Sequence, residues 1–269
     1  MTMVKAGRAR IYTEVHGQGE DLLLVPGLGG RAQFWANQIA PFARRFRVIL
    51  HDHRGTGRSS RARGPYSVRQ MAEDVLKVMD HHGVAAAHYV GHSTGGAIGQ
   101  YLSLNHPDRI RKLVLSATWA GPDPLFTDLF RHRRDVLKKC GAAAYLFEGT
   151  LLATPASVLQ SQYAATRDVM ATRLRDFPGI AIETSRIGAV LAHDLRRHIH
   201  RIAHRPLVIA ARDDLITPPG FSAELARRIP GARLEVLPSG GHFCPMTEPE
   251  DYNRRVLKFL GGAPRRSRS

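Results

Sequence analysis

Short apolar runs that suit buried strands alternate along this chain with segments whose apolar residues recur at helical spacing. Between 68 and 82, for example, Met71, Val75, Val78 and Met79 share one helical face. The runs that predict strands are found at 22–25, 46–50, 87–90, 112–116, 206–210 and 234–237. Strands that alternate with helices predict a mostly parallel central sheet flanked by helices on both faces, which is an α/β fold.

The alternation stops near residue 120 and returns near 204, and the pattern between these points predicts helices only. The domains that we predict are an α/β core at 1–120 and 204–263, a helical cap (lid) insertion at 121–203 and a disordered basic tail at 264–269. Within the core, residues 8–25 predict a β-hairpin with its turn at His16–Gly19.

The charge of the chain is unusually positive, with 39 Lys and Arg against 23 Asp and Glu and a formal net charge of +16. The basic residues are scattered, and neither a nucleic-acid-binding module nor a basic stripe with interleaved aromatics is visible, so we expect no nucleic-acid partner. We interpret the charge as a solvated basic surface that could also steer anionic substrates.

Two cysteines form no disulfide framework and no zinc-binding spacing, so we expect no metal and no cofactor. Residues 1–10 lack the apolar core of a signal peptide, and no run is long enough for a membrane span, so we expect a cytoplasmic protein without a membrane partner. A homodimer is left open, because the sequence does not determine the oligomeric state.

The candidate nucleophile is Ser93, in the sequence Gly91-His92-Ser93-Thr94-Gly95 between a predicted strand and a predicted helix. This G-x-S-x-G pattern in a strand–turn–helix setting is typical of a nucleophile elbow. The turn is so tight that side chains two positions either side of the serine would collide, and Gly91 and Gly95 remove them. The Thr94 N–H would then point to the place where a substrate oxyanion forms.

A serine hydroxyl needs an adjacent base, and His242 is the best placed of 14 histidines. It follows the last predicted strand in a glycine-rich loop, at the edge where α/β sheets place their ligands. The acid of such a triad should lie between the serine and the histidine, just after a strand. Asp213 and Asp214 both meet this condition.

Three further segments are candidates for roles around Ser93. The loop Pro26–Gly30 follows a buried strand, and Leu28 is expected to supply the second oxyanion-hole N–H, beside that of Thr94. Gly27 and Trp119 are expected to contact substrate, although a core position for Trp119 is equally consistent with the sequence. The turn His51–Ser59 is interpreted as structural, with Asp52 and Arg54 paired, because His51 and His53 lack further metal ligands at a convincing spacing.

Taken together, these segments resemble the α/β-hydrolase superfamily over nearly the whole chain, least clearly at 121–203. The motifs that carry the resemblance are Pro26-Gly27-Leu28-Gly29, Asp52-x-Arg54-Gly55-x-Gly57-x-Ser59, Gly91-x-Ser93-x-Gly95-Gly96, Asp213-Asp214-x-Ile216-x-Pro218 and Gly240-Gly241-His242. The subgroup that the chain resembles most is the 3-oxoadipate enol-lactonase and aminoacrylate (carbamate) hydrolase group. The spacing to Pro218 in that family favours Asp214 as the acid.

The resemblance and the motifs predict a serine hydrolase that cleaves a small carboxylic ester, lactone or enol-lactone through an acyl-enzyme, with Ser93, Asp214 and His242 as the triad. The expected partner is a small molecule, with an anionic one among the candidates. One alternative is hydrolysis of a C–N bond in a carbamate or amide. Another is a ligand receptor with the same fold and no catalysis.

Overall fold

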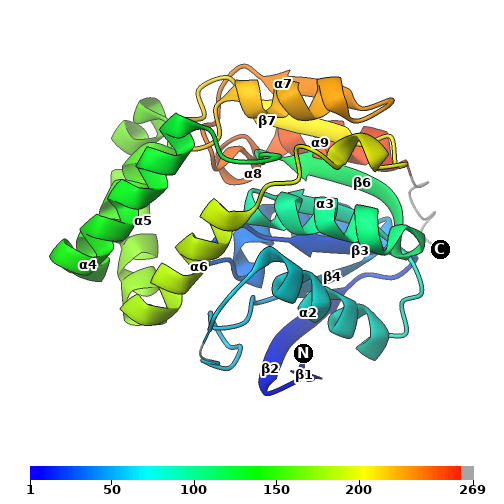
Figure 1. Ribbon diagram of the computed structural model, residues 1–269, viewed down its shortest axis with the longest axis horizontal. Coiled ribbons are helices and arrows are strands. Elements are labelled where there is room, and N and C mark those ends of the chain that lie inside the picture. The colour runs from blue at the N-terminus through cyan, green and yellow to red at the C-terminus, as the bar shows by residue number, and fades with distance from the viewer. Residues whose placement is uncertain (63, 262–269) are drawn as a thin grey trace, which may run out of the picture.

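A single sheet of eight strands forms the centre of the computed structural model, which describes residues 1–62 and 64–261 (Figure 1). The spatial order is β1-β2-β4-β3-β5-β6-β7-β8, and every pair from β4 to β8 is parallel. The strands are β1 (Thr2–Ala6), β2 (Ala9–His16), β3 (Glu20–Val25), β4 (Phe46–His51), β5 (Ala87–His92), β6 (Ile110–Ser116), β7 (Leu207–Ala211) and β8 (Arg233–Leu237). The predicted α/β class is confirmed, and the tail at 264–269 lies outside the described residues.

The hairpin predicted at 8–25 is wrong. The strand β2 pairs with β1 across Gly7 and with β4 on its other side, and both pairs are antiparallel. The strand β3 lies between β4 and β5 instead. The physical reason is burial, because Leu22 to Val25 are buried on both faces and suit only an inner strand.

Helices cover both faces of the sheet (Figure 1). On one face α1 (Ala36–Ala43) and α9 (Pro249–Leu260) pack with Trp35 and the apolar side chains of the inner strands. On the other face lie α2 (Val68–His81), α3 (Thr94–Asn105) and α7 (Pro219–Arg228). The side chain of Ser67 caps α2 by accepting from Gln70 N at 3.1 Å.

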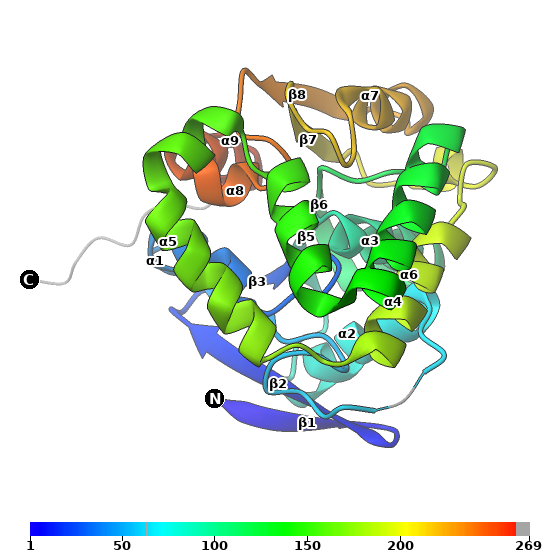
Figure 2. The same cartoon turned by 90° about the vertical axis from the view of Figure 1, so that its left-hand side faces the viewer.

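Three helices occupy the segment between β6 and β7, namely α4 (Pro124–Ala153), α5 (Ala156–Arg175) and α6 (Ile180–Ala192). We call them the cap helices. They project beyond one end of the sheet, and in Figure 2 β3, β5 and β6 lie behind them. A kink at Gly141, with φ of 84°, lets α4 turn back over this end. Among the described residues, no helix is long and apolar enough to cross a membrane.

Candidate active site

Ser93 lies at the junction of β5 and α3 in a strained conformation, with φ of 54° and ψ of −117°. A side chain on Gly95 would collide with the carbonyl oxygen of Val25, and one on Gly91 would collide with the carbonyl of Gly95. The Ser93 N–H donates to Ser116 O at 2.8 Å, which anchors the turn to β6. The hydroxyl of Ser93 makes no capping hydrogen bond to α3, so it is not used for helix stability.

The loop after β3 packs directly against the serine. A Cβ on Gly27 would lie 3.0 Å from Ser93 Cβ and 3.4 Å from its Oγ, so the backbone of this loop borders the hydroxyl. Leu28 is the next residue, and Gly30 N donates to Gly27 O at 3.0 Å to close the turn. Thr94 is the first residue of α3, where N–H groups have no partner within the helix. Of the two predicted oxyanion donors, Leu28 thus lies in the loop that borders Ser93, and Thr94 lies at the start of α3.

His242 lies in the loop between β8 and α8 (Cys244–Thr247), with its side chain buried. Its Nδ1 is 2.8 Å from Oδ2 of Asp214. Because an ionised carboxylate only accepts hydrogen bonds, this contact requires the proton on Nδ1 and leaves Nε2 able to accept one. That is the tautomer that a general base needs.

The carboxylate of Asp214 is held mainly by the turn that follows it. Oδ1 accepts from Ile216 N at 2.8 Å and Thr217 N at 2.9 Å, and Oδ2 accepts from Thr217 Oγ1 at 2.9 Å. The same hydroxyl oxygen lies 3.2 Å from His242 Nδ1. Sequence reasoning missed Thr217, although its position three residues after the acid is a capping pattern that could have indicated it.

Asp213 does a different task from its neighbour. Its carboxylate accepts from Gly241 N at 2.9 Å and from Gly240 N at 3.4 Å. It therefore holds the glycine loop that carries His242, while Asp214 contacts the imidazole itself. Of the two candidate acids, the structure brings Asp214 to the histidine.

His92 is buried beside the imidazole of His242, and sequence reasoning missed this contact. The two ring centroids are 4.9 Å apart, and Phe34 stacks on His92 at 4.8 Å. Burial, together with the nearby charge of protonated His242, holds the pKa of His92 well below its ordinary value. The neutral ring of His92, the residue before the candidate nucleophile, thus packs against the candidate base.

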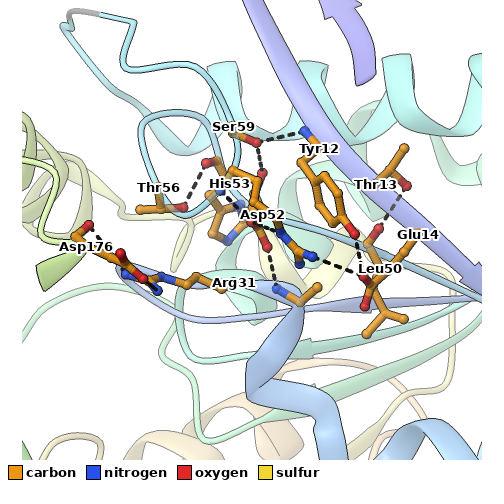
Figure 3. A network of polar contacts seen from close by, with 12 residues as sticks. Tyr12, Thr13, Glu14, Arg31, Leu50, Asp52, His53, Thr56, Ser59 and Asp176 are labelled. Atoms are coloured by element: carbon orange, nitrogen blue, oxygen red, sulfur yellow. Dashed lines mark hydrogen bonds and ion pairs between the residues drawn. The ribbon is translucent and has the colours of Figure 1, made fainter. Parts of the chain in front are cut away.

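The predicted Asp52–Arg54 pair is wrong. Figure 3 shows Asp52 within a network of polar contacts. Its carboxylate accepts from Ala32 N and Arg58 N, each at 2.8 Å, and from Arg58 Nε at 3.2 Å. Arg54 binds Asp74 of α2 instead, with Nε 2.9 Å from Oδ2. The turn after Asp52 folds back through Gly55 and Gly57, both with positive φ, and this brings Arg58 rather than Arg54 to the carboxylate.

The histidine pair of the same turn supports the loop beside Ser93. His51 Nε2 is 3.2 Å from His53 Nδ1, and His53 Nε2 is 2.9 Å from Pro26 O. Burial lowers the pKa of His51 to about 4 and that of His53 well below its ordinary value, so both are neutral near pH 7. In the parts of the chain that the structure describes, no group of three or more metal-binding side chains occurs.

Trp119 lies in an aromatic cluster of the core, with 1% of its surface exposed. Its ring is 4.9 Å from that of Phe126 and 5.7 Å from that of His193. Its carbonyl accepts from Gln100 Nε2 of α3 at 2.9 Å. The predicted contact of Trp119 with substrate stays a prediction.

Comparisons with known proteins concern the fold and the family of this chain. The profile of the α/β hydrolase fold family matches residues 22–249. A relative from Caulobacter segnis named "Putative carbamate hydrolase RutD" is 42% identical over 94% of this chain and 97% of its own length. Among solved structures, a hydrolase from Pseudomonas aeruginosa has a TM-score of 0.88 at 29% identity and covers 97% of this chain and 99% of its own. An enol-lactonase from Burkholderia xenovorans has a TM-score of 0.86 at 27% identity, with 96% and 99% covered.

Proposed function

Because the chain belongs to the α/β-hydrolase family and is a hydrolase, we propose that it cleaves a small carbonyl compound through an acyl-enzyme on Ser93. The observation that carries this proposal is the 2.8 Å contact between His242 Nδ1 and Asp214 Oδ2, together with a serine on a strained turn whose neighbour His92 packs on His242. A ligand receptor would need neither the strain nor the buried carboxylate that orients the imidazole.

In the first half of the proposed reaction, Ser93 Oγ attacks the carbonyl carbon while Nε2 of His242 accepts the hydroxyl proton. The N–H groups of Leu28 and Thr94 donate to the oxyanion. The bond to the leaving group then breaks, and the leaving atom takes the proton from His242. In the second half, His242 removes a proton from water, and the hydroxide attacks the acyl carbon. The bond to Ser93 Oγ then breaks, Oγ takes the proton from His242, and the acid is released.

Two kinds of bond are candidates for cleavage. An ester, lactone or enol-lactone is supported by the triad geometry and by the likeness to the B. xenovorans enol-lactonase. A carbamate C–N bond is the second candidate, and the name of the 42%-identical relative favours it. The same chemistry at Ser93 serves both, because only the leaving atom differs.

Hydrolysis of p-nitrophenyl butyrate by the wild type and by Ser93→Ala tests the mechanism. We expect kcat of Ser93→Ala to be about 10⁴- to 10⁶-fold lower than kcat of the wild type, as in other triad hydrolases. A serine-directed fluorophosphonate should label the wild type at Ser93. Equal activity of both proteins would exclude Ser93 as the nucleophile.

A substrate panel with a γ-lactone, a carboxylic ester and a carbamate of matched size then separates the two bonds. Release of ammonia or amine at a higher kcat/KM than release of alcohol would favour the C–N bond. The reverse order would favour the ester or lactone.

A further inference from the structure

A group of charged side chains is buried where the cap helices meet the core. Arg186 of α6 has only 1% of its surface exposed, and its Nε and Nη1 have no hydrogen-bond partner among the described residues. The nearest ring that it faces is Tyr66, whose centroid is 5.9 Å from the guanidinium carbon. Burial lowers the pKa of Arg186, which reflects the cost of a charge without water around it.

Glu183, one turn before Arg186 on α6, does not satisfy that guanidinium. Its Oε1 accepts instead from Tyr145 Oη at 2.8 Å, and its Oε2 has no partner in the described part of the chain. No ion pair within 4.0 Å joins Glu183 to Arg186 among the residues that the structure describes. Glu183 thus binds Tyr145 on α4, and Nε and Nη1 of Arg186 have no partner in the described part of the chain.

The balance of charge in this region is positive. Arg133 of α4 lies over the Tyr145 ring at 4.7 Å and reaches Glu148 at 3.8 Å. Burial also lowers the pKa of Arg173 on α5, which feels the charges of Glu183 and Arg133. Two buried arginines, Arg133 and Arg186, and the partly buried Arg173 therefore share two carboxylates, and we call this group the cap arginine cluster.

The cluster borders the loop that packs against Ser93. A Cβ on Gly29 would lie 3.7 Å from Glu183 Oε1, and Gly29 follows Gly27, which contacts the serine side chain. On its other side, burial and then the charges of His51 and Arg186 lower the pKa of His53, whose ring is hydrogen-bonded to Pro26 O at the start of the same loop. These contacts place Glu183 and Arg186 near the loop that borders Ser93.

A buried guanidinium with unpartnered nitrogens costs several kcal/mol unless an anion or water satisfies it. We propose that Arg186 is a substrate-binding residue that holds a free carboxylate carried by the acyl part of the substrate. A guanidinium binds the two oxygens of a carboxylate through Nη2 together with either Nε or Nη1, so each unpartnered nitrogen of Arg186 belongs to one such fork. This geometry favours a carboxylate over a neutral acyl chain. This inference rests on the proposed acyl transfer at Ser93 and names the substrate class of that site.

Two esters test the proposal, p-nitrophenyl hydrogen glutarate and its methyl ester, which differ only in the free carboxylate. For the wild type we expect kcat/KM to be about 10- to 100-fold higher for the anionic ester, the range set by charged hydrogen bonds, chiefly through a lower KM. In Arg186→Gln this ratio should fall towards 1. Arg186→Lys keeps the charge and should retain part of the preference. Arg167→Gln, an exposed arginine on α5, should keep the wild-type ratio.

Two results would overturn the proposal, namely a wild-type ratio near 1 and an unchanged ratio in Arg186→Gln. If Arg186→Gln does not fold, the ratios of kcat/KM for the two esters in the wild type and in Arg186→Lys decide whether the proposal stands. Failure of the acyl-transfer mechanism would be recognised separately, because neither ester would be cleaved and fluorophosphonate would not label Ser93. In that case the binding of glutarate tests the subsite. Glutarate should raise the Tm of the wild type, raise that of Arg186→Lys by less and leave that of Arg186→Gln unchanged, and no shift in the wild type refutes the subsite.

Discussion

The carboxylate of Asp214 beside the candidate base and the charged side chains inside the cap differ in how fully they are hydrogen-bonded. Both oxygens of Asp214 are bonded, two of the donors being main-chain N–H groups of the next turn. Under the cap, Arg186 has two nitrogens and Glu183 one oxygen without a partner in the described residues. Ser93 is held by strands and tight turns, whereas α5 has no buried residue at all.

This difference corresponds to two roles, the orientation of the base in the core and the choice of substrate under the cap. Main-chain donors cannot change rotamer, so a carboxylate that they hold orients a base with little freedom, as a proton transfer requires. Side chains under a cap can be substituted without changing the sheet. Those of their polar groups that lack a hydrogen-bond partner are available to a ligand. The comparison predicts that changes in the core loops alter rate and folding, and that changes in the cap alter substrate choice.

Replacing the two neighbouring aspartates tests the core half of the comparison most strongly. Asp214→Asn should lower kcat for an ester substrate by about 10³- to 10⁴-fold, because the amide no longer enforces the tautomer with the proton on Nδ1. Asp213→Asn should lower it by less than about 10-fold, because its amide oxygen can still accept from Gly241 N. Steady-state kinetics measure both, and an equal or larger loss in Asp213→Asn would reverse our assignment of the acid.

A pair of glycine variants compares the two regions by stability. Gly95→Ala would place a methyl group against the Val25 carbonyl, and we expect a loss of about 3 kcal/mol or more in the free energy of unfolding. Gly188→Ala lies on an exposed face of α6 with no atom within 4 Å of the new methyl, and it should gain about 0.5–1 kcal/mol. Urea unfolding measures both, and a tolerated Gly95→Ala would show that the elbow can relax.

The buried histidines predict a loss of stability in acid. The pKa of His51 is about 4 in the folded protein and near 6.5 when unfolded, so between these values the unfolded chain binds more protons. The stabilisation is complete above pH 6.5 and is lost as the pH falls to about 4, by on the order of 2–3 kcal/mol. Because carboxylates also titrate there, the measurement is the difference in unfolding free energy between wild type and His51→Gln across this window. A difference that does not change with pH would contradict the prediction.

The smallest expected effect is that of removing the Thr217 hydroxyl, which donates to the carboxylate of Asp214. Thr217→Val removes the donor to Asp214 Oδ2 but keeps the main-chain N–H bonds, so we expect kcat to fall by about 3- to 10-fold. Thr166→Val on α5 removes a hydroxyl bonded only to Gln162 O and should leave kcat unchanged. A loss in Thr166→Val as large as that in Thr217→Val would mean that the cap is coupled to the base.

Local patterns were sufficient to predict the parallel sheet, the helical segment between β6 and β7 and the turn at Ser93. The spacing of apolar residues indicates which face of an element is buried. The glycines at 91 and 95 indicate a turn within five residues that is too tight for side chains at these positions. The candidate base was recognisable for the same reason, since a histidine in a glycine loop after a strand is a local signal.

Contacts between distant segments could be decided only by the tertiary structure. The pairing of β2 with β4, the binding of Asp52 by Arg58 and the packing of His92 on His242 depend on how loops return to the sheet. Asp213 and Asp214 have the same side chain, and the spacing to Pro218 in the family that the chain resembles favoured Asp214. The fold shows the contact itself, in which the carboxylate of Asp214 reaches the imidazole. Arg186 is one of many scattered arginines by composition, and burial under the cap, which no local pattern encodes, distinguishes it from the others.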